Sequence, residues 1–485
     1  MSIRQKTISG LAWSFIDNFA GLGVNFVFGI ILARLLLPKE YGLIGMTAIF
    51  MAVSQAFVDS GFGNSLIRKP DCGQKDFSTV FYFNLAVSIC CYALLFISAG
   101  TISRYFKEPQ LLPLIRVLAV SIIINGFGAI QRTILIKHVD FKKQAKINVI
   151  SNVISGCLGI VMAYRGHGVW SLAWMSVMHN FLAVSLLWTW SIWRPAWLFD
   201  RESFKEMFGF GSKLLISGLI DTIYRNVYYL VIGKYFSATE LGYYTRAMQF
   251  QALPSSNITG IIQRVSYPVL AQLQGKNEQL KAGYQKLIKS SMFISFVLMV
   301  GMAASAKPMV LFLIGEKWLT SAVYLQMLCF AGMFYPIHAL NLNMLNVKGR
   351  SDLFLKLEVI KKLLAIPTIV IGIFFGIKIM IAGMMVNTLI SYYLNSYWSG
   401  ILIGYPMKEQ VRDIAPSLLL ALGMGAAVYA LSLVLPLVPG LVFGIQVLAG
   451  AGLTIGLARL FRVDAYLEMQ KIAKEQWIRQ FKTER

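Results

Sequence analysis

Long apolar runs, separated by short polar segments, make up most of the chain. Runs of 18 or more apolar residues are long enough to cross a bilayer as helices. Lipid offers no hydrogen-bond partner to the backbone, so such runs fold as α-helices. The pattern therefore predicts an all-α polytopic membrane protein with about 14 transmembrane helices. We expect these spans at residues 8–36, 41–66, 78–101, 111–135, 147–164, 169–193, 207–236, 242–270, 288–314, 319–346, 354–376, 379–404, 414–437 and 440–461.

Composition excludes several other classes of protein. The 485 residues are 57% hydrophobic and only 14% charged, whereas a soluble domain carries roughly a quarter charged residues. Five cysteines in this length are too few for a disulfide scaffold. The four histidines are scattered and have no cysteine partners at metal-binding spacing, so we expect no metal and no cofactor. The first run carries Asp17 and Asn18 and is too long for a secretory signal, so we expect it to remain as a span.

The basic residues indicate the orientation of the chain. Lysine and arginine total 45 against 22 acids, a net charge of +23. With the N-terminus inside, 29 basic residues fall on the cytoplasmic side and eight on the opposite side. This bias follows the positive-inside rule and predicts an inner-membrane protein with both termini in the cytoplasm. The basic residues form no separate domain, so nucleic acid is not an expected partner.

An internal repeat relates the two halves of the chain. Residues 30–42 (IILARLLLPKEYG) and 230–242 (LVIGKYFSATELG) align at a constant offset of 200. Glu40 then matches Glu240, and Gly42 matches Gly242. Both copies begin on the same side, so the repeat is parallel: two six-helix lobes plus two extra helices, a plan known among transporters.

The repeat sets the expected domain boundaries. The stretch around Pro195, with mixed charge, separates the lobes, and the tail places Tyr466, Met469 and Trp477 at helical spacing among basic residues. Such a tail is typical of a helix lying on a membrane surface. The expected parts are an N-terminal lobe at 1–193, a linker at 194–206, a C-terminal lobe at 207–405, helices 13 and 14 at 406–462, and a basic amphipathic cytoplasmic tail at 463–485.

The first spans resemble a known family. The residues that carry the resemblance are Gly10-x-x-Trp13, Ala33-Arg34-Leu35-Leu36 and Pro38-x-Glu40-Tyr41-Gly42-Leu43. They are similar to the start of Wzx-type polysaccharide flippases, in the polysaccharide transporter branch of the multidrug/oligosaccharidyl-lipid/polysaccharide exporter superfamily, and most of all to its colanic-acid-exporter-like members. The pattern is fairly specific for the superfamily and weak for the substrate.

That resemblance implies a function. Wzx-type flippases move an undecaprenyl-pyrophosphate-linked oligosaccharide from the cytoplasmic to the periplasmic leaflet of the inner membrane, by alternating access between two lobes around a cationic cavity. The expected partners are this substrate, membrane lipids and the polysaccharide polymerase machinery. Two lobes in one chain make a functional monomer sufficient, and no enzymatic activity is expected.

Ionisable residues within membrane spans are functional candidates because burying charge in lipid is costly. Arginine suits a pyrophosphate because its planar group donates paired hydrogen bonds, and tyrosine suits a sugar ring. Arg225 also has Asp221 one turn away as a structural partner, and other basic residues can reach the headgroups instead. The candidate substrate-binding residues are Arg225, Arg246, Arg264, Lys307, Tyr224 and Tyr228.

Acidic residues within the spans are candidates for ion coupling. Asp17, Asp59 and Asp221 could each bind a proton or Na⁺, or could serve as the counter-ion of an arginine; Asp17 is the strongest candidate, because no basic residue lies within four positions of it. We expect Glu358 to form a structural pair with Lys362 at i+4.

Two rival transporters remain. A drug or cation antiporter of the same superfamily would favour an acidic cavity, whereas the spans hold eight basic residues and four acids. A lipid II flippase would differ only in its cargo. A membrane enzyme such as a polymerase or ligase is disfavoured because the sequence has no long periplasmic loop and no nucleophile–base signature, and without a Walker-type loop no built-in ATPase is expected.

Overall fold

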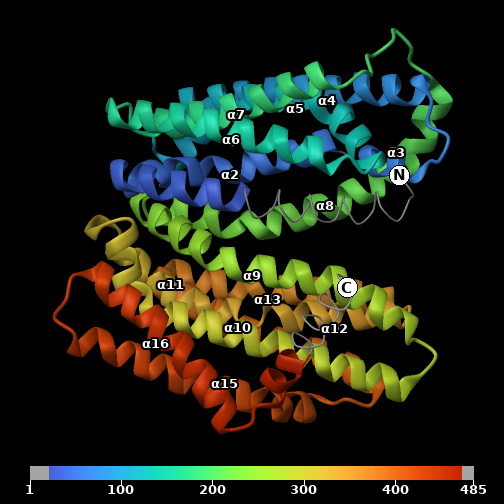
Figure 1. The fold of residues 1–485 in the computed structure, drawn as a ribbon. Coiled ribbons are helices and arrows are strands. Elements are labelled where there is room, and N and C mark those ends of the chain that lie inside the picture. The colour runs from blue at the N-terminus through green and yellow to red at the C-terminus, as the bar shows by residue number, and fades with distance from the viewer. Residues whose placement is uncertain (1–20, 60, 472–485) are drawn as a thin grey trace, which may run out of the picture. The chain divides into compact units, whose positions relative to one another are not determined.

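The computed structural model describes residues 21–59 and 61–471, and every regular element in that part is a helix (Figure 1). The expected all-α fold is therefore confirmed. The elements are a helix at Gly21–Leu35, α2 (Pro38–Asp59), α3 (Phe62–Arg68), α4 (Gln74–Phe106), α5 (Leu111–Lys137), α6 (Phe141–Tyr164), α7 (Val169–Trp190), α8 (Arg201–Tyr235), α9 (Ala238–Gln272), α10 (Asn277–Leu313), the 3₁₀ helix η1 (Glu316–Trp318), α11 (Leu319–Gly332), α12 (Tyr335–Val347), α13 (Ser351–Phe375), α14 (Ile377–Ile403), α15 (Met407–Val434) and α16 (Pro439–Leu460).

Ten helical segments in the described residues are long and apolar enough to cross a membrane. The other four predicted spans correspond to the Gly21–Leu35 helix, which is short, and to α8, α9 and α13. Many charged and polar side chains lie along α8 and α9, and the apolar run of α13 includes Glu358, Lys361 and Lys362. The chain is thus a multi-pass membrane protein, and the expected count of fourteen is compatible with its helices.

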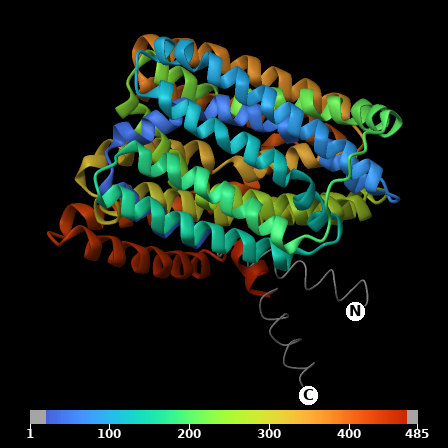
Figure 2. The same cartoon turned by 90° about the horizontal axis from the view of Figure 1, so that it is seen from above.

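The chain forms two compact units, residues 1–242 and 243–485. Within each unit the long helices run side by side (Figures 1 and 2). The first unit includes α8, which packs along α2, α3 and α4. The lobe boundary expected at 194–206 stays a prediction.

The two units repeat one pattern of helix packing. In the first unit α4 packs on α5, α5 on α7, and α6 on α7. In the second unit α10 packs on α11 and α12, these two pack on α14, and α13 packs on α14. The correspondence has the order expected of a parallel repeat. The two extra helices, α15 and α16, pack on α10 and on each other.

Two repeat-related glycines bring the first turns of α2 and α9 into direct contact within residues 1–242. A Cβ atom on Gly42 would lie 1.6 Å from the carbonyl oxygen of Ala238. A Cβ atom on Gly242 would lie 1.8 Å from the carbonyl oxygen of Pro38. The contact is reciprocal, and both pairs are related by the offset of 200 residues. Only glycine allows two backbones to approach so closely.

Two of the expected continuous spans are interrupted. The span predicted at 41–66 divides into α2 and α3, and Gly61 between them has a left-handed φ of 70°. The span predicted at 319–346 divides into α11 and α12 around Met333 and Phe334. Pro336, in the first turn of α12, has no N–H to continue the hydrogen bonds of α11.

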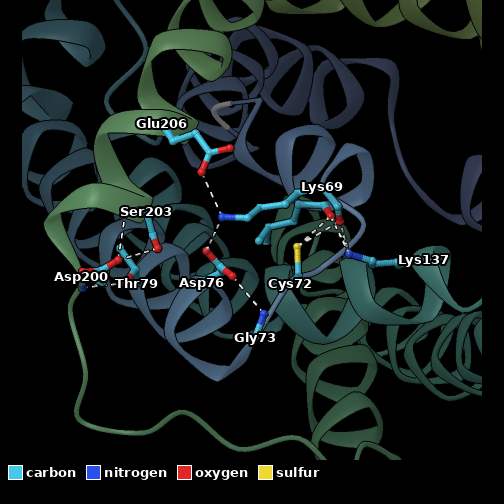
Figure 3. A network of polar contacts seen from close by, with 10 residues as sticks. Lys69, Cys72, Gly73, Asp76, Thr79, Lys137, Asp200, Ser203 and Glu206 are labelled. Carbon is cyan, nitrogen blue, oxygen red and sulfur yellow. Dashed lines mark hydrogen bonds and ion pairs between the residues drawn. The ribbon is translucent and has the colours of Figure 1, made fainter.

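Ion pairs hold the first turns of α8 to the loop before α4 (Figure 3). The Nζ atom of Lys69 lies 2.9 Å from Oε2 of Glu206 and 3.1 Å from Oδ1 of Asp76. Asp76 in turn accepts a hydrogen bond of 2.9 Å from the backbone N–H of Gly73. The hydrogen bond to Glu206, followed by that to Asp76, raises the pKa of Lys69 above its ordinary value.

A second lysine closes the end of α3 in the same network. The Nζ atom of Lys137 donates to the carbonyl oxygens of Leu66, at 2.9 Å, and Lys69, at 2.6 Å. Because the last carbonyls of a helix lack partners within it, a cation there is stabilising.

Aromatic packing also holds the start of α8 against α3 and α4. The ring centroid of Phe204 in α8 lies 6.1 Å from that of Phe62 and 5.1 Å from that of Phe83.

The other end of α8 is held as well. The Nζ atom of Lys234 donates to the carbonyl oxygen of Tyr105 at 2.6 Å and lies 3.9 Å from the centroid of its ring. Gly233 packs closely against Met46 and Phe106. The first unit therefore fixes α8 near both ends, and the segment between them carries Asp221, Tyr224, Arg225 and Tyr228.

Alanine at the glycine contact tests its tightness. We expect Gly42→Ala or Gly242→Ala to lower the free energy of unfolding by about 1–3 kcal/mol, because the new methyl group meets backbone that cannot move aside easily. Thermal unfolding of the purified protein in detergent measures this loss. The control is Gly444→Ala in α16, where a Cβ atom meets nothing within 4 Å; equal behaviour of all three variants would contradict the close contact.

Replacing Lys69 by methionine tests the ion pairs at the start of α8. We expect a loss of about 1 kcal/mol at neutral pH, since Glu206 is more than half exposed and solvent weakens the pair. Pairing raises the pKa of Lys69, so its contribution is complete below the ordinary value of 10.5 and is lost as the pH rises through the folded-state pKa. The thermal stabilities of the two proteins should therefore converge at alkaline pH. The neighbouring change Lys205→Met, at an exposed position, should have little effect at any pH.

Candidate functional site

Arg225 and Asp221 form an ion pair within α8. The Nε atom of Arg225 donates to Oδ2 of Asp221 at 2.7 Å, and the arginine side chain is 76% exposed. The terminal nitrogens of Arg225 make no hydrogen bond with residues that the structure describes. The structural pair expected from the i−4 spacing is present, and it leaves the outer edge of the guanidinium open to a ligand.

The two candidate tyrosines of α8 differ in exposure. Tyr224 is half-buried beside Arg225, whereas Tyr228, one turn further on, is 7% exposed. Tyr224 is therefore the better placed of the two for stacking on a sugar. Their roles in binding stay predictions.

Arg246, in the second unit, is buried. It is 7% exposed, and its Nη1 atom donates to Oε1 of Gln249 at 2.7 Å. The guanidinium lies 5.8 Å from the ring centroid of Trp318, a distance typical of a cation–π contact. This environment favours a role in packing the second unit over direct contact with cargo.

Arg264 of α9 and Lys307 of α10 are exposed side chains of the second unit. Neither forms an ion pair with any residue in the described part of the chain. Each side chain therefore offers a positive charge, as expected. Its surroundings do not indicate which ligand it would bind, so both roles stay predictions.

Asp59, at the end of α2, lies in a chain of amide hydrogen bonds. Its Oδ1 atom accepts from Nε2 of Gln55 at 2.9 Å, and Oε1 of Gln55 accepts from Nδ2 of Asn125 at 3.1 Å. The chain links α2 to α5 beside the interruption at Gly61. Transporter helices that are interrupted within the membrane often supply ion or substrate sites.

Sequence reasoning missed Arg132 in this group. Its position near the end of a predicted span suggested a cytoplasmic loop, but it lies inside α5, five residues before the last residue, Lys137. It is within electrostatic range of Asp59 and of His179 in α7. No ion pair within 4 Å joins Arg132 to a described carboxylate. The available signal was that Arg132 lies inside the predicted span 111–135, three residues before its end.

The second unit has its own polar group on α12, α13 and α14. Glu358 pairs with Lys361 at i+3, which corrects the expected pair with Lys362 at i+4. Both spacings lie on one helix face, and the structure uses Lys361, whose side chain is only 13% exposed. On the adjoining helices the amide of Asn395 lies 3.3 Å from Nδ1 of His338.

The structure brings some of the predicted residues together. Asp221, Tyr224, Arg225 and Tyr228 share one stretch of α8, and Asp59 also lies in the first unit. Arg246, Arg264 and Lys307 lie in the second unit, on α9 and α10. Asp17 falls outside the described residues.

The chain is similar to known proteins of polysaccharide biosynthesis. A model of the family described as "Polysaccharide biosynthesis protein" matches residues 31–323. The lipopolysaccharide biosynthesis protein WzxC of Escherichia coli is 28% identical over 405 residues, 81% of this chain and 82% of WzxC. The teichuronic acid biosynthesis protein TuaB of Bacillus subtilis is 26% identical over 354 residues, 73% of each chain.

Solved structures show the same fold. The lipid II flippase MurJ, in an inward closed conformation, matches with a TM-score of 0.74 at 16% identity, covering 94% of this chain and 99% of MurJ. An inward-facing multidrug transporter of the MATE family matches with a TM-score of 0.61 at 17% identity, covering 79% of this chain and 95% of the transporter. The family model spans more than half of the sequence, and the chain therefore belongs to the polysaccharide biosynthesis protein family.

Proposed function

We propose that the protein is a flippase for a lipid-linked oligosaccharide. It moves an undecaprenyl-pyrophosphate-linked oligosaccharide from the cytoplasmic to the periplasmic leaflet of the inner membrane, and both of its termini are cytoplasmic. Membership of the family supports this proposal, as do relatives named for lipopolysaccharide and teichuronic acid biosynthesis. The fold shared with a lipid II flippase supports transport over enzymatic chemistry.

The exposed guanidinium of Arg225 carries the proposal for the binding site. Asp221 accepts a hydrogen bond from the Nε atom, and the terminal N–H groups make no hydrogen bond with residues that the structure describes. Two parallel N–H donors match the spacing of phosphate oxygens, which suits arginine for a pyrophosphate. Half-buried Tyr224 beside it offers a ring and a hydroxyl to the first sugar.

The proposed transport cycle alternates the access of this site between the two sides of the membrane. The polar cargo crosses against protein, while the undecaprenyl tail stays in the lipid. The anchored ends of α8 keep Arg225 in place relative to the first unit. We propose that one chain is sufficient for this cycle and that the product passes to the polysaccharide polymerase machinery.

Lipid II remains the alternative cargo, favoured by the fold of MurJ. Both cargoes carry a pyrophosphate, so Arg225 would serve either. A drug or cation antiporter fits less well, because the exposed charges at the candidate sites on α8, α9 and α10 are mainly basic.

We also propose ion coupling through Asp59. Its carboxylate is hydrogen-bonded to the neutral amide of Gln55, and it has no ion pair within 4 Å to a described cation. A carboxylate in this state can gain a proton or Na⁺ without first breaking a salt bridge. Arg132 nearby would favour release of the bound cation.

The transport assay for Arg225 uses proteoliposomes and a fluorescent undecaprenyl-pyrophosphate oligosaccharide. We expect Arg225→Ala to lower translocation at least about tenfold, because a charge-assisted hydrogen bond contributes about 1.5–3 kcal/mol. Arg225→Lys should retain part of the activity. Arg201→Ala, at the exposed first residue of the same helix, is the matched control and should transport normally.

Two results would contradict the proposal at different levels. Normal transport by a folded Arg225→Ala variant would exclude Arg225 as the pyrophosphate contact while leaving the flippase function standing. Failure of the folded wild type to move any lipid-linked glycan, with or without an ion gradient, would exclude the flippase. A cation-efflux assay on the same vesicles then tests the antiporter.

Imposed gradients test coupling through Asp59. We expect a proton or Na⁺ gradient to accelerate wild-type transport severalfold and to have no effect on Asp59→Asn, which cannot lose or gain the charge. Flip rates without a gradient should change less. Asp71→Asn, in the exposed loop after α3, is the control and should respond like the wild type; a full response by Asp59→Asn would exclude this residue.

A further inference from the structure

A polar cleft lies in the second unit, between the first turns of α10 and the C-terminal segment. Its volume is about 410 Å³, a size typical of small-ligand sites. Residues 464–471 form a short helix that makes one wall. The polar lining residues are Gln285, Lys286, Lys289, Asp464, Glu468 and Lys471.

Apolar packing fixes the wall formed by residues 464–471. The ring centroids of Tyr466 and Phe293 lie 6.2 Å apart. Val463 and Ala465 are buried in one cluster with Phe293 and Leu420 of α15. Apolar side chains in the described part of the tail thus pack this segment against α10, and the expected amphipathic helix at 463–485 stays a prediction. The rest of the tail lies outside the described residues.

Both signs of charge line the cleft. Lys286 lies 3.5 Å from Glu468, and Lys289 lies 3.5 Å from Asp464, which is long for an ion pair. The side chain of Lys286 is 68% exposed. Lys471 pairs with no carboxylate of the described residues. Three lysines and two carboxylates therefore line the cleft, and the Nζ atom of Lys289 also lies 3.3 Å from Oδ1 of Asp413 in α15.

The length of α10 places the cleft at the level of the lipid headgroups. Lys289 precedes the last residue of α10, Leu313, by 24 residues, or about 36 Å at 1.5 Å per residue. The hydrocarbon core of a bilayer is about 30 Å thick, and its headgroup layers bring the total to about 40–45 Å. If α10 crosses the whole core, Lys289 reaches the headgroup layer, so a phospholipid is the available ligand.

We propose that this cleft binds the phosphoethanolamine headgroup of a phospholipid. Lys286, Lys289 and Lys471 bind the phosphate, and Asp464 and Glu468 accept hydrogen bonds from the ammonium group. A purely anionic headgroup would leave the two carboxylates facing its own charge. A choline headgroup has no N–H to donate to them. The site is separate from the cargo-binding residues of the proposed flippase and does not depend on that function.

Binding of defined lipids to the delipidated full-length protein tests the proposal. Native mass spectrometry in detergent would be used with phosphatidylethanolamine, phosphatidylcholine and phosphatidylglycerol of the same acyl chains. We expect phosphatidylethanolamine to bind about tenfold more tightly than either other lipid, the effect of one charge-assisted hydrogen bond. Equal binding of phosphatidylethanolamine and phosphatidylcholine would overturn the proposal.

Variants divide the site into its two halves. Lys286→Gln with Lys289→Gln should weaken phosphatidylethanolamine about tenfold by removing contacts to phosphate. Asp464→Asn with Glu468→Gln should abolish the preference over phosphatidylglycerol. The charge-matched control, Lys356→Gln with Lys408→Gln, changes two exposed lysines outside the cleft and should bind as the wild type does.

Two further outcomes would also overturn the proposal. One is unchanged lipid binding by both cleft variants. The other is displacement of the lipid by millimolar inorganic phosphate alone, which would indicate a site for free phosphate. If the double lysine variant is not folded, Lys286→Gln alone decides the test, because that side chain is largely exposed and its loss leaves the packing intact.

Discussion

A charge in the hydrocarbon region of a bilayer is unfavourable by several kcal/mol unless protein or water surrounds it, and this constraint organises the polar parts of the molecule. Within the described spans Asp221 lies beside Arg225, Lys361 beside Glu358, and Arg246 against Gln249 and Trp318. The helices that carry these groups, α8, α9 and α13, are not among the ten segments of the described residues that are long and apolar enough to cross a membrane.

In each unit an ion pair joins the start of a late helix to the start of an early helix. Lys69 joins the loop before α4 to Glu206 at the start of α8. Lys281, at the start of α10, lies 3.0 Å from Glu409 at the start of α15. Since α4 and α10 are repeat partners, α8 and α15 have similar attachments in their own units. The packing of α15 and α16 on α10 then makes these two helices integral parts of the second unit.

The sequence predicted the helices and the repeat well because both depend on local patterns. Apolar runs mark the spans, and the match of Gly42 with Gly242 marks the repeat, although the close contact between these two turns was not predicted. The interruptions at Gly61 and Phe334 were missed, since a glycine or proline in an apolar run does not by itself break a helix. The approach of Arg132 to Asp59 was missed because it joins helices that are far apart in sequence. The choice of Lys361 over Lys362 depends on which face of α13 is buried, and a single sequence does not give that face.

The reciprocal contact of Gly42 and Gly242 constrains how the two halves of the chain can change during evolution. Each glycine faces the backbone of the other copy's equivalent turn, so a larger residue in one half cannot be accommodated by changes in that half alone. After the duplication that the repeat implies, the two copies were free to diverge in most of their length but not here. A hybrid that joins residues 1–200 of this chain to the second half of a relative should assemble stably only when the relative also has glycine at the position of Gly242.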